Sequence, residues 1–164
     1  MPAKLNYQII RLQQENQSLL EALDKLYRMF AADEGHTTPP EQFATYVSQR
    51  LDDEHMLLIL AMVPLDNSSS LPVGYALVFD VMEHPFIPDW QRSGYITQMF
   101  VQSDYRQQGL GQLLFDYSMD WLAERNVPQV LLNIHPENAL AERFWQKQGF
   151  SAYLTRMKCL VPND

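Results

Sequence analysis

The sequence has only one cysteine, Cys159, among its 164 residues. An internal disulfide is therefore impossible, and a zinc site built on C-x-x-C pairs is excluded. We expect a reducing compartment, with the cytoplasm as the default location. The N-terminal stretch MPAKLNYQIIRLQQENQSLL is polar and broken by charges, and no apolar run approaches the roughly 18 residues of a membrane span. We expect neither a signal peptide nor contact with a membrane.

Positive charge is also scarce. Twelve Lys and Arg residues stand against 20 Asp and Glu, which gives a formal net charge of -8. Because recognition of a phosphate backbone needs a positive field, nucleic acid is not expected as a partner. The acidity favours a cationic substrate, or it serves solubility alone. The length and the 46% of hydrophobic residues predict a single globular domain over residues 1–164.

Several catalytic and phosphate-binding motifs are missing. A dinucleotide fingerprint would need a third glycine where Leu114 stands. The Gly-Lys-Ser/Thr of a P-loop, the G-x-S-x-G elbow and the H-E-x-x-H zinc motif are all absent. His36 and His55 have no partner at metal-ligand spacing. We therefore expect no metal site.

Hydrophobic periodicity predicts alternating strands and helices in the order β-α-α-β-β-β-α-β-α-β. The segment 95–134 reads as a strand–helix–strand unit, which implies a parallel pair with a right-handed crossover. The strands before it are expected to pair antiparallel, so the fold class is α/β (α+β mixed), with helices on both faces of a mixed sheet. The predicted ranges are 5–12, 15–30, 38–51, 55–63, 72–82, 95–101, 109–126, 129–134, 136–148 and 151–161.

The turn RQQGLG, residues 106–111, joins the strand ending at Val101 to the helix beginning near Gly109. The first N–H groups of a helix have no intrahelical partner and lie at the positive end of its dipole. Glycines let phosphate oxygens approach the backbone, and Arg106 can add a charge-assisted contact. The turn is interpreted as a diphosphate site, or else as a tight structural turn without a ligand.

Two motifs make the sequence resemble the GNAT superfamily of acyl-CoA-dependent N-acetyltransferases. RQQGLG fits the family's (Arg/Gln)-x-x-Gly-x-(Gly/Ala) signature at every fixed position. NALAERFWQKQGF, residues 138–150, fits a second element, in which Asn, Ala and an aromatic pair precede Gly-Phe. The resemblance covers nearly the whole chain. It implies a mostly antiparallel sheet with a central, splayed parallel pair.

The resemblance also implies acetyl-CoA as the donor and a direct attack of an amine on its thioester. The backbone around the signature would cradle the diphosphate, and the preceding strand would pair with the pantetheine amides. Asn138 would contact the cofactor arm, although a helix-terminal role is its rival. The implied cofactor-binding residues are Met99, Phe100, Val101, Arg106, Gln107, Gln108, Gly109, Leu110, Gly111, Gln112, Asn138 and Trp145.

The first departure from the family pattern concerns the general acid. Trp145 stands where many members carry the tyrosine that protonates the leaving thiolate, and an indole N–H can donate a hydrogen bond but does not release its proton. Tyr153 is a possible substitute, or it is a packed strand aromatic. The oxyanion is expected to form near the amides of Met99 or Phe100.

The second departure concerns the base. Strand alternation predicts Tyr95, Thr97 and Met99 on one face, yet none is the glutamate that many members carry there. The proton is expected to pass to Glu83 or to a water held by Thr97. His84 and Asp89 are further candidates, and all three loop residues are otherwise solvated charges. His135 reads as a turn residue.

The expected activity is therefore acetyl transfer to a primary amine of a small, cationic molecule. An amino acid, an aminoglycoside-like compound or a protein N-terminus would also fit the chemistry. The missing glutamate and Trp145 motivate an alternative, an acyl-CoA-binding sensor with little catalysis. A third reading is an interaction domain without a cofactor. A homodimer is possible, through the N-terminal helix.

Overall fold

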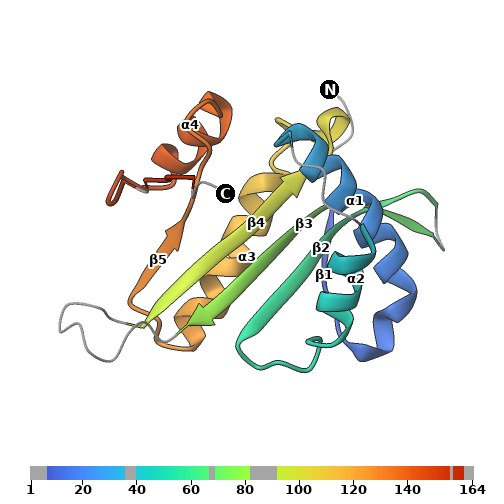
Figure 1. Cartoon of the computed structure of the whole chain (residues 1–164). Coiled ribbons are helices and arrows are strands. Elements are labelled where there is room, and N and C mark those ends of the chain that lie inside the picture. Colours follow the sequence, from blue (N-terminus) through green and yellow to red (C-terminus); the bar gives the residue numbers. More distant parts are fainter. Residues whose placement is uncertain (1–6, 36–39, 67–68, 82–91, 156, 161–164) are drawn as a thin grey trace, which may run out of the picture. The chain divides into compact units, whose positions relative to one another are not determined.

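The computed structural model describes residues 7–35, 40–66, 69–81, 92–155 and 157–160. It divides into two units, residues 1–132 and 133–164. The first unit contains a sheet of five strands in the order β1-β2-β3-β4-β5 (Figure 1). Its elements are β1 (Gln8–Arg11), a 3-10 segment (Gln14–Leu19), α1 (Leu20–Asp33), α2 (Pro40–Ser48), β2 (Met56–Pro64), β3 (Ser70–Val81), β4 (Ser93–Val101), a 3-10 turn (Ser103–Tyr105), α3 (Leu110–Glu124) and β5 (Gln129–Leu132).

The pairing of the strands confirms the predicted mixed sheet. Strands β1 to β4 pair antiparallel with their neighbours. Among the described strands, only β4 and β5 are parallel, and α3 makes the crossover between them. The predicted hairpin of 55–63 and 72–82 corresponds to β2 and β3, in which Leu60 pairs with Tyr75.

Helices cover both faces of this sheet, as the sequence predicts. Figure 1 shows α1 and α2 on the near side and α3 behind β3 and β4. The α1/α2 side holds a continuous core in which Leu23 and Leu26 of α1 pack with Leu58 and Tyr75. On the other side α3 lies so close to β4 that a Cβ added to Gly94 would come within 2.5 Å of Leu122 Cδ1. Five aromatic residues on the α1/α2 side contact one another: Tyr27, Phe30, Phe43, Tyr75 and Phe100.

A bulge at Thr97 interrupts β4. Gln98 pairs with Leu77 and Ile96 with Val78, so Thr97 is an extra residue in the ladder. Tyr95 pairs with Phe79, on the α1/α2 side, whereas Met99 pairs with Ala76, on the opposite side. The prediction that Tyr95 and Met99 share a face was therefore wrong, because the bulge reverses the alternation between them.

The second unit contains one helix in the part that the structure describes, α4 (Ala139–Lys147). The predicted strand 151–161 was wrong for residues 151–155 and 157–160, which form no strand. Leu154 and Met157 are 78% and 90% exposed. The segment has β-type alternation but no pairing partner among the described residues, and propensity alone does not make a strand. The parallel pair consequently lies at the edge of the described sheet.

Candidate functional site

The turn between β4 and α3 has the backbone shape of an anion site. Gln107 and Gly109 both take left-handed conformations, with φ of 61° and 89°. Such turns aim successive amides into a concavity that suits an anion. The first helical bond runs from the Leu113 amide to the Gly109 carbonyl at 3.0 Å. No acceptor among the described residues takes the amides of residues 107–111, which leaves them available to a ligand.

Arg106 holds the turn against its neighbours. Its Nε donates to the Val101 carbonyl at 2.7 Å, and its Nη2 donates to Asp33 Oδ2 at 2.6 Å. The guanidinium also lies 5.5 Å from the centre of the Phe100 ring. Because Asp33 ends α1, this side chain ties the turn to both β4 and α1. Its contact with a diphosphate remains a prediction.

The other residues of the signature differ in what their side chains do. The side chain of Leu110 is buried in the core, so its backbone alone can serve a ligand. Gln112 Nε2 donates to Asp116 Oδ1 at 2.8 Å along the exposed surface of α3. Gln108 accepts a hydrogen bond from the Tyr7 hydroxyl. Gly111 is the second residue of α3.

Beyond the bulge, β4 has an unpaired edge. Its pairing with β5 ends at Ile96 and Leu132, and no described residue continues the ladder along Met99, Phe100 and Val101. Peptide-like groups can add to such an edge through backbone hydrogen bonds. This edge leads directly to the turn at 106–111, so the two predicted parts of a donor site are continuous in the chain and in space.

Sequence reasoning missed a polar pair where β4 leaves β5. The Tyr75 hydroxyl donates to Gln98 Oε1 at 3.0 Å. Burial, and secondarily the nearby Tyr27, raises the pKa of Tyr75, so its hydroxyl stays protonated and acts as a donor. Gln98 follows the bulge directly and is half-buried. A glutamine inside the apolar strand YITQMFV was the available signal.

Among the described residues, the predicted catalytic side chains do not form one group. Thr97 is exposed at the bulge of β4. Glu83, His84 and Asp89 lie outside the described residues. The strand ends that flank that segment, Val81 and Ser93, pair with each other at the end of β4 opposite the turn.

The second unit supplies the remaining predicted residues. The Asn138 side chain accepts from the Ala141 amide at 3.0 Å and caps α4, which is the helix-terminal role that rivals contact with the cofactor arm. Trp145 is 9% exposed and packs edge-on against Phe144 and Phe150. Tyr153 is 71% exposed and so is not a packed strand aromatic. The His135 carbonyl accepts from the Asn138 amide at 2.9 Å, as a turn residue would.

The comparison with protein families shows which family this chain belongs to. Residues 19–150 match the sequence profile described as the acetyltransferase (GNAT) family. The chain belongs to that family. The GNAT acetyltransferases are acyltransferases. The match includes strands β2 to β5 of the sheet and the whole of α4.

Individual relatives agree with the GNAT assignment. A segment of 60 residues is 30% identical to N-alpha-acetyltransferase 30 of Schizosaccharomyces pombe; it spans 37% of this chain and 40% of that protein. The solved aminoglycoside N-acetyltransferase AAC(6')-Iy in complex with CoA is similar in fold, with a TM-score of 0.76, 17% identity and coverage of 97% and 99% of the two chains. An aminoglycoside acetyltransferase from an uncultured soil metagenomic sample, solved with sisomicin, has a TM-score of 0.71, 16% identity and coverage of 96% and 97%.

A charged cluster lies at the end of the GNAT sheet opposite the turn. The Asp80 side chain is 1% exposed and receives both Nε, at 2.8 Å, and Nη2 of Arg92. Arg125 Nε and His55 Nδ1 lie 3.9 Å and 3.7 Å from Asp80 Oδ2. The hydrogen bonds from Arg92 lower the pKa of Asp80 against the opposing effect of burial. The cluster joins the ends of β2, β3, β4 and α3.

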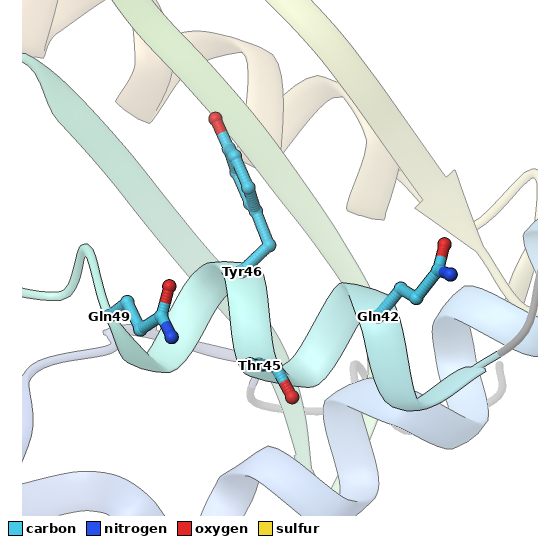
Figure 2. Close-up of a pocket in the computed structure, with 4 residues that line it drawn as sticks. All are labelled: Gln42, Thr45, Tyr46 and Gln49. Atoms are coloured by element: carbon cyan, nitrogen blue, oxygen red, sulfur yellow. The ribbon is translucent and has the colours of Figure 1, made fainter.

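The exposed surface of α2 carries a groove of about 440 Å³, lined by Gln42, Thr45, Tyr46 and Gln49. Figure 2 shows Gln42 and Tyr46 extending to the same side of the helix. The Arg50 guanidinium already lies 4.0 Å from the centre of the Tyr46 ring, and none of the lining residues is charged. The described lining residues therefore offer no charged group that could form an ion pair with an ammonium or a diphosphate.

The described residues contain no group of three or more His, Cys, Asp or Glu side chains that could hold a metal ion. None of their helices is both long and apolar enough to cross a membrane.

Proposed function

We propose that this GNAT protein transfers the acetyl group of acetyl-CoA to a primary amine of a small cationic molecule. The observation that carries the proposal is the turn at 106–111: no described residue accepts from the amides of residues 107–111, and the turn continues the unpaired edge of β4. A diphosphate supplies anionic oxygens for the turn, and pantetheine supplies peptide-like groups for the edge. The donor thus fits the residues that are present.

We propose that the backbone makes most of the contacts to the donor and that a few side chains add to them. The amides of residues 107–112 bind the diphosphate, and Met99 to Val101 pair with the pantetheine. Arg106 contributes long-range positive charge, which Asp33 partly neutralises at 2.6 Å. Asn138 and Trp145 belong to the second unit and complete the proposed set. Since the family profile covers residues in both units, we propose that residues 1–164 work as a single domain.

The proposed reaction is a direct transfer. The neutral nitrogen of the amine attacks the thioester carbonyl carbon, a C–N bond forms, the C–S bond breaks, and the CoA thiolate takes up a proton. Because a free alkylamine is largely protonated near neutral pH, a base must first remove its proton. A water held by Thr97 or the carboxylate of Glu83 is proposed for that role, and Tyr153 for protonation of the thiolate.

The proposed acceptor class rests on charge. A net charge of -8 attracts cationic molecules, and two of the similar solved structures are aminoglycoside acetyltransferases. A protein N-terminus is the second candidate acceptor, favoured by the 30% identity to N-alpha-acetyltransferase 30 over 60 residues. The two acceptors differ in size and charge, so one screen separates them.

The test has two stages. Calorimetric titration with acetyl-CoA is expected to show binding, and the same titration with S-acetylpantetheine, which lacks the diphosphate, is expected to show much weaker binding. A screen of polyamines, aminoglycosides and N-terminal peptides then follows release of the CoA thiol. Absence of binding at millimolar acetyl-CoA would contradict the proposal. Binding without turnover on any amine would instead favour the acyl-CoA sensor.

A further inference from the structure

The hydroxyl of Tyr7 reaches the donor turn from the far end of the sequence. It donates to Gln108 Oε1 at 2.6 Å, across 101 residues of chain. Tyr7 immediately precedes β1, whose first residue, Gln8, pairs with Met62 of β2. The edge strand β1 therefore anchors Tyr7, whereas the hydrogen-bond partner of Tyr7, Gln108, lies in the loop before α3.

The same glutamine is held at its other end. Gln108 Nε2 donates to the carbonyl of Asp104 at 3.0 Å. Both polar atoms of the side-chain amide are thus engaged, one by Tyr7 and one by the 3-10 turn. An amide fixed at two points has little freedom to rotate.

The position of Gln108 makes this restraint relevant to a ligand. It lies between Gln107 and Gly109, the two residues with left-handed backbone. A glutamine oxygen without this partner is a free acceptor, and we infer that it would compete with a ligand for the neighbouring amides of the turn. Engaged by Tyr7, the oxygen is withdrawn from that competition, and the amides remain open to an anion.

We propose that Tyr7 is a positioning residue for the donor: its hydroxyl holds the Gln108 side chain away from the diphosphate-binding amides. The inference rests on the proposed function, because it presumes a diphosphate at this turn. Tyr7 acts through Gln108 and does not itself contact the donor. Removing the hydroxyl is expected to weaken donor binding about three- to tenfold, the range of one hydrogen bond.

The test uses the full chain and the variant Tyr7→Phe, which deletes only the hydroxyl. Calorimetry with acetyl-CoA is expected to give a Kd about three- to tenfold higher than for the wild type. The Kd for S-acetylpantetheine, which has no diphosphate, is expected to be unchanged. Tyr117→Phe makes the same deletion on the exposed surface of α3 and is expected to change neither value.

A double-mutant cycle separates positioning from general destabilisation. In a Gln108→Ala background, Tyr7→Phe is expected to have no further effect on the Kd for acetyl-CoA. An unchanged Kd in Tyr7→Phe, an equal loss for S-acetylpantetheine, or a full additive loss in the double variant would overturn the inference and leave the proposed function standing. If the wild type itself fails to bind acetyl-CoA, the proposed function fails and the role of Tyr7 falls with it.

Discussion

At the scale of single residues, Gly109 combines a left-handed backbone with a place in the proposed diphosphate-binding turn. Its φ of 89° is one that side-chain-bearing residues rarely adopt, yet a Cβ there would have no protein atom within 4 Å. Gly109→Val is therefore expected to cost about 1–2 kcal/mol of unfolding free energy through backbone strain alone. It is also expected to abolish acetyl-CoA binding, because the new side chain enters the space of the diphosphate. Denaturant unfolding and calorimetry measure the two effects.

Gly35 provides the matched control for Gly109. Its φ is 71°, and a Cβ there also has no protein atom within 4 Å. Gly35→Val is expected to lose a similar amount of stability while keeping its affinity for acetyl-CoA. Equal loss of affinity in both variants would show that strain, and not occlusion of the turn, controls binding.

The sequence predicted the turn but not the contacts that hold it. Glycine spacing after a strand is a local pattern, and the left-handed backbone of Gly109 agrees with the predicted turn; anion binding there stays a prediction. The partners of Arg106 and Gln108 are Asp33 and Tyr7, which lie 73 and 101 residues away. Such pairs depend on how strands and helices assemble, so periodicity and spacing carry no signal for them.

At the scale of elements, the packing of α3 on β4 rests on a missing side chain. A Cβ at Gly94 would lie 2.5 Å and 2.8 Å from the two Cδ atoms of Leu122. Gly94→Ala is expected to destabilise by about 1–3 kcal/mol through overpacking. Leu122→Ala is expected to cost about 2–5 kcal/mol through its cavity. In the double variant the new methyl group occupies part of that cavity, so the combined loss is expected to fall short of the sum. Strict additivity in denaturant unfolding would contradict this packing.

The Asp80 cluster ties together the ends of β2, β3, β4 and α3. Asp80→Asn leaves Arg92 and Arg125 without their shared carboxylate, and we expect a loss of about 2–4 kcal/mol of unfolding free energy at neutral pH. Asp120→Asn, on the exposed surface of α3, is the control and is expected to be nearly neutral. Denaturant unfolding at pH 7 checks both.

The same cluster predicts a pH dependence. The hydrogen bonds from Arg92 hold the pKa of Asp80 below its ordinary value in the folded state. Its stabilising contribution is therefore complete above the unfolded pKa of about 3.9 and is lost as the pH falls through the lower, folded pKa. The difference in stability between wild type and Asp80→Asn is expected to be constant from pH 5 to 7 and to shrink below about pH 4. A difference that stays constant down to about pH 2 would contradict this account of Asp80.

Elements that depend on local periodicity could be predicted from the sequence, and features that depend on a partner strand could not. The helices and the four antiparallel strands carry strong periodicity, so the sequence indicated them within a few residues. The bulge at Thr97 has no periodic pattern that predicts it, because an extra residue in one strand is defined only by its pairing with the neighbouring strand. The last predicted strand failed for the same reason: residues 151–155 and 157–160 have strand-like alternation and no partner in the described structure.

At the scale of the whole molecule, the net charge of -8 sets the long-range field. A field of this sign accelerates encounter with polycations, and salt screens it because the Debye length falls below about 10 Å above 0.1 M. For a polyamine acceptor, kcat/KM is therefore expected to fall about three- to tenfold when ionic strength rises from roughly 50 to 500 mM. Initial rates of thiol release at subsaturating acceptor measure this.

A monoamine supplies the comparison for that salt effect. It reacts through the same neutral nitrogen but carries no second charge, so its kcat/KM is expected to change little over the same range. Acetyl-CoA is anionic, and its KM is expected to be unchanged or to fall with salt, because screening removes its repulsion from the acidic surface. Equal salt dependence for the two acceptors would mean that the acidity serves solubility and does not select the substrate. The acceptor class would then have to be sought in the contacts around Gln98 and the edge of β4.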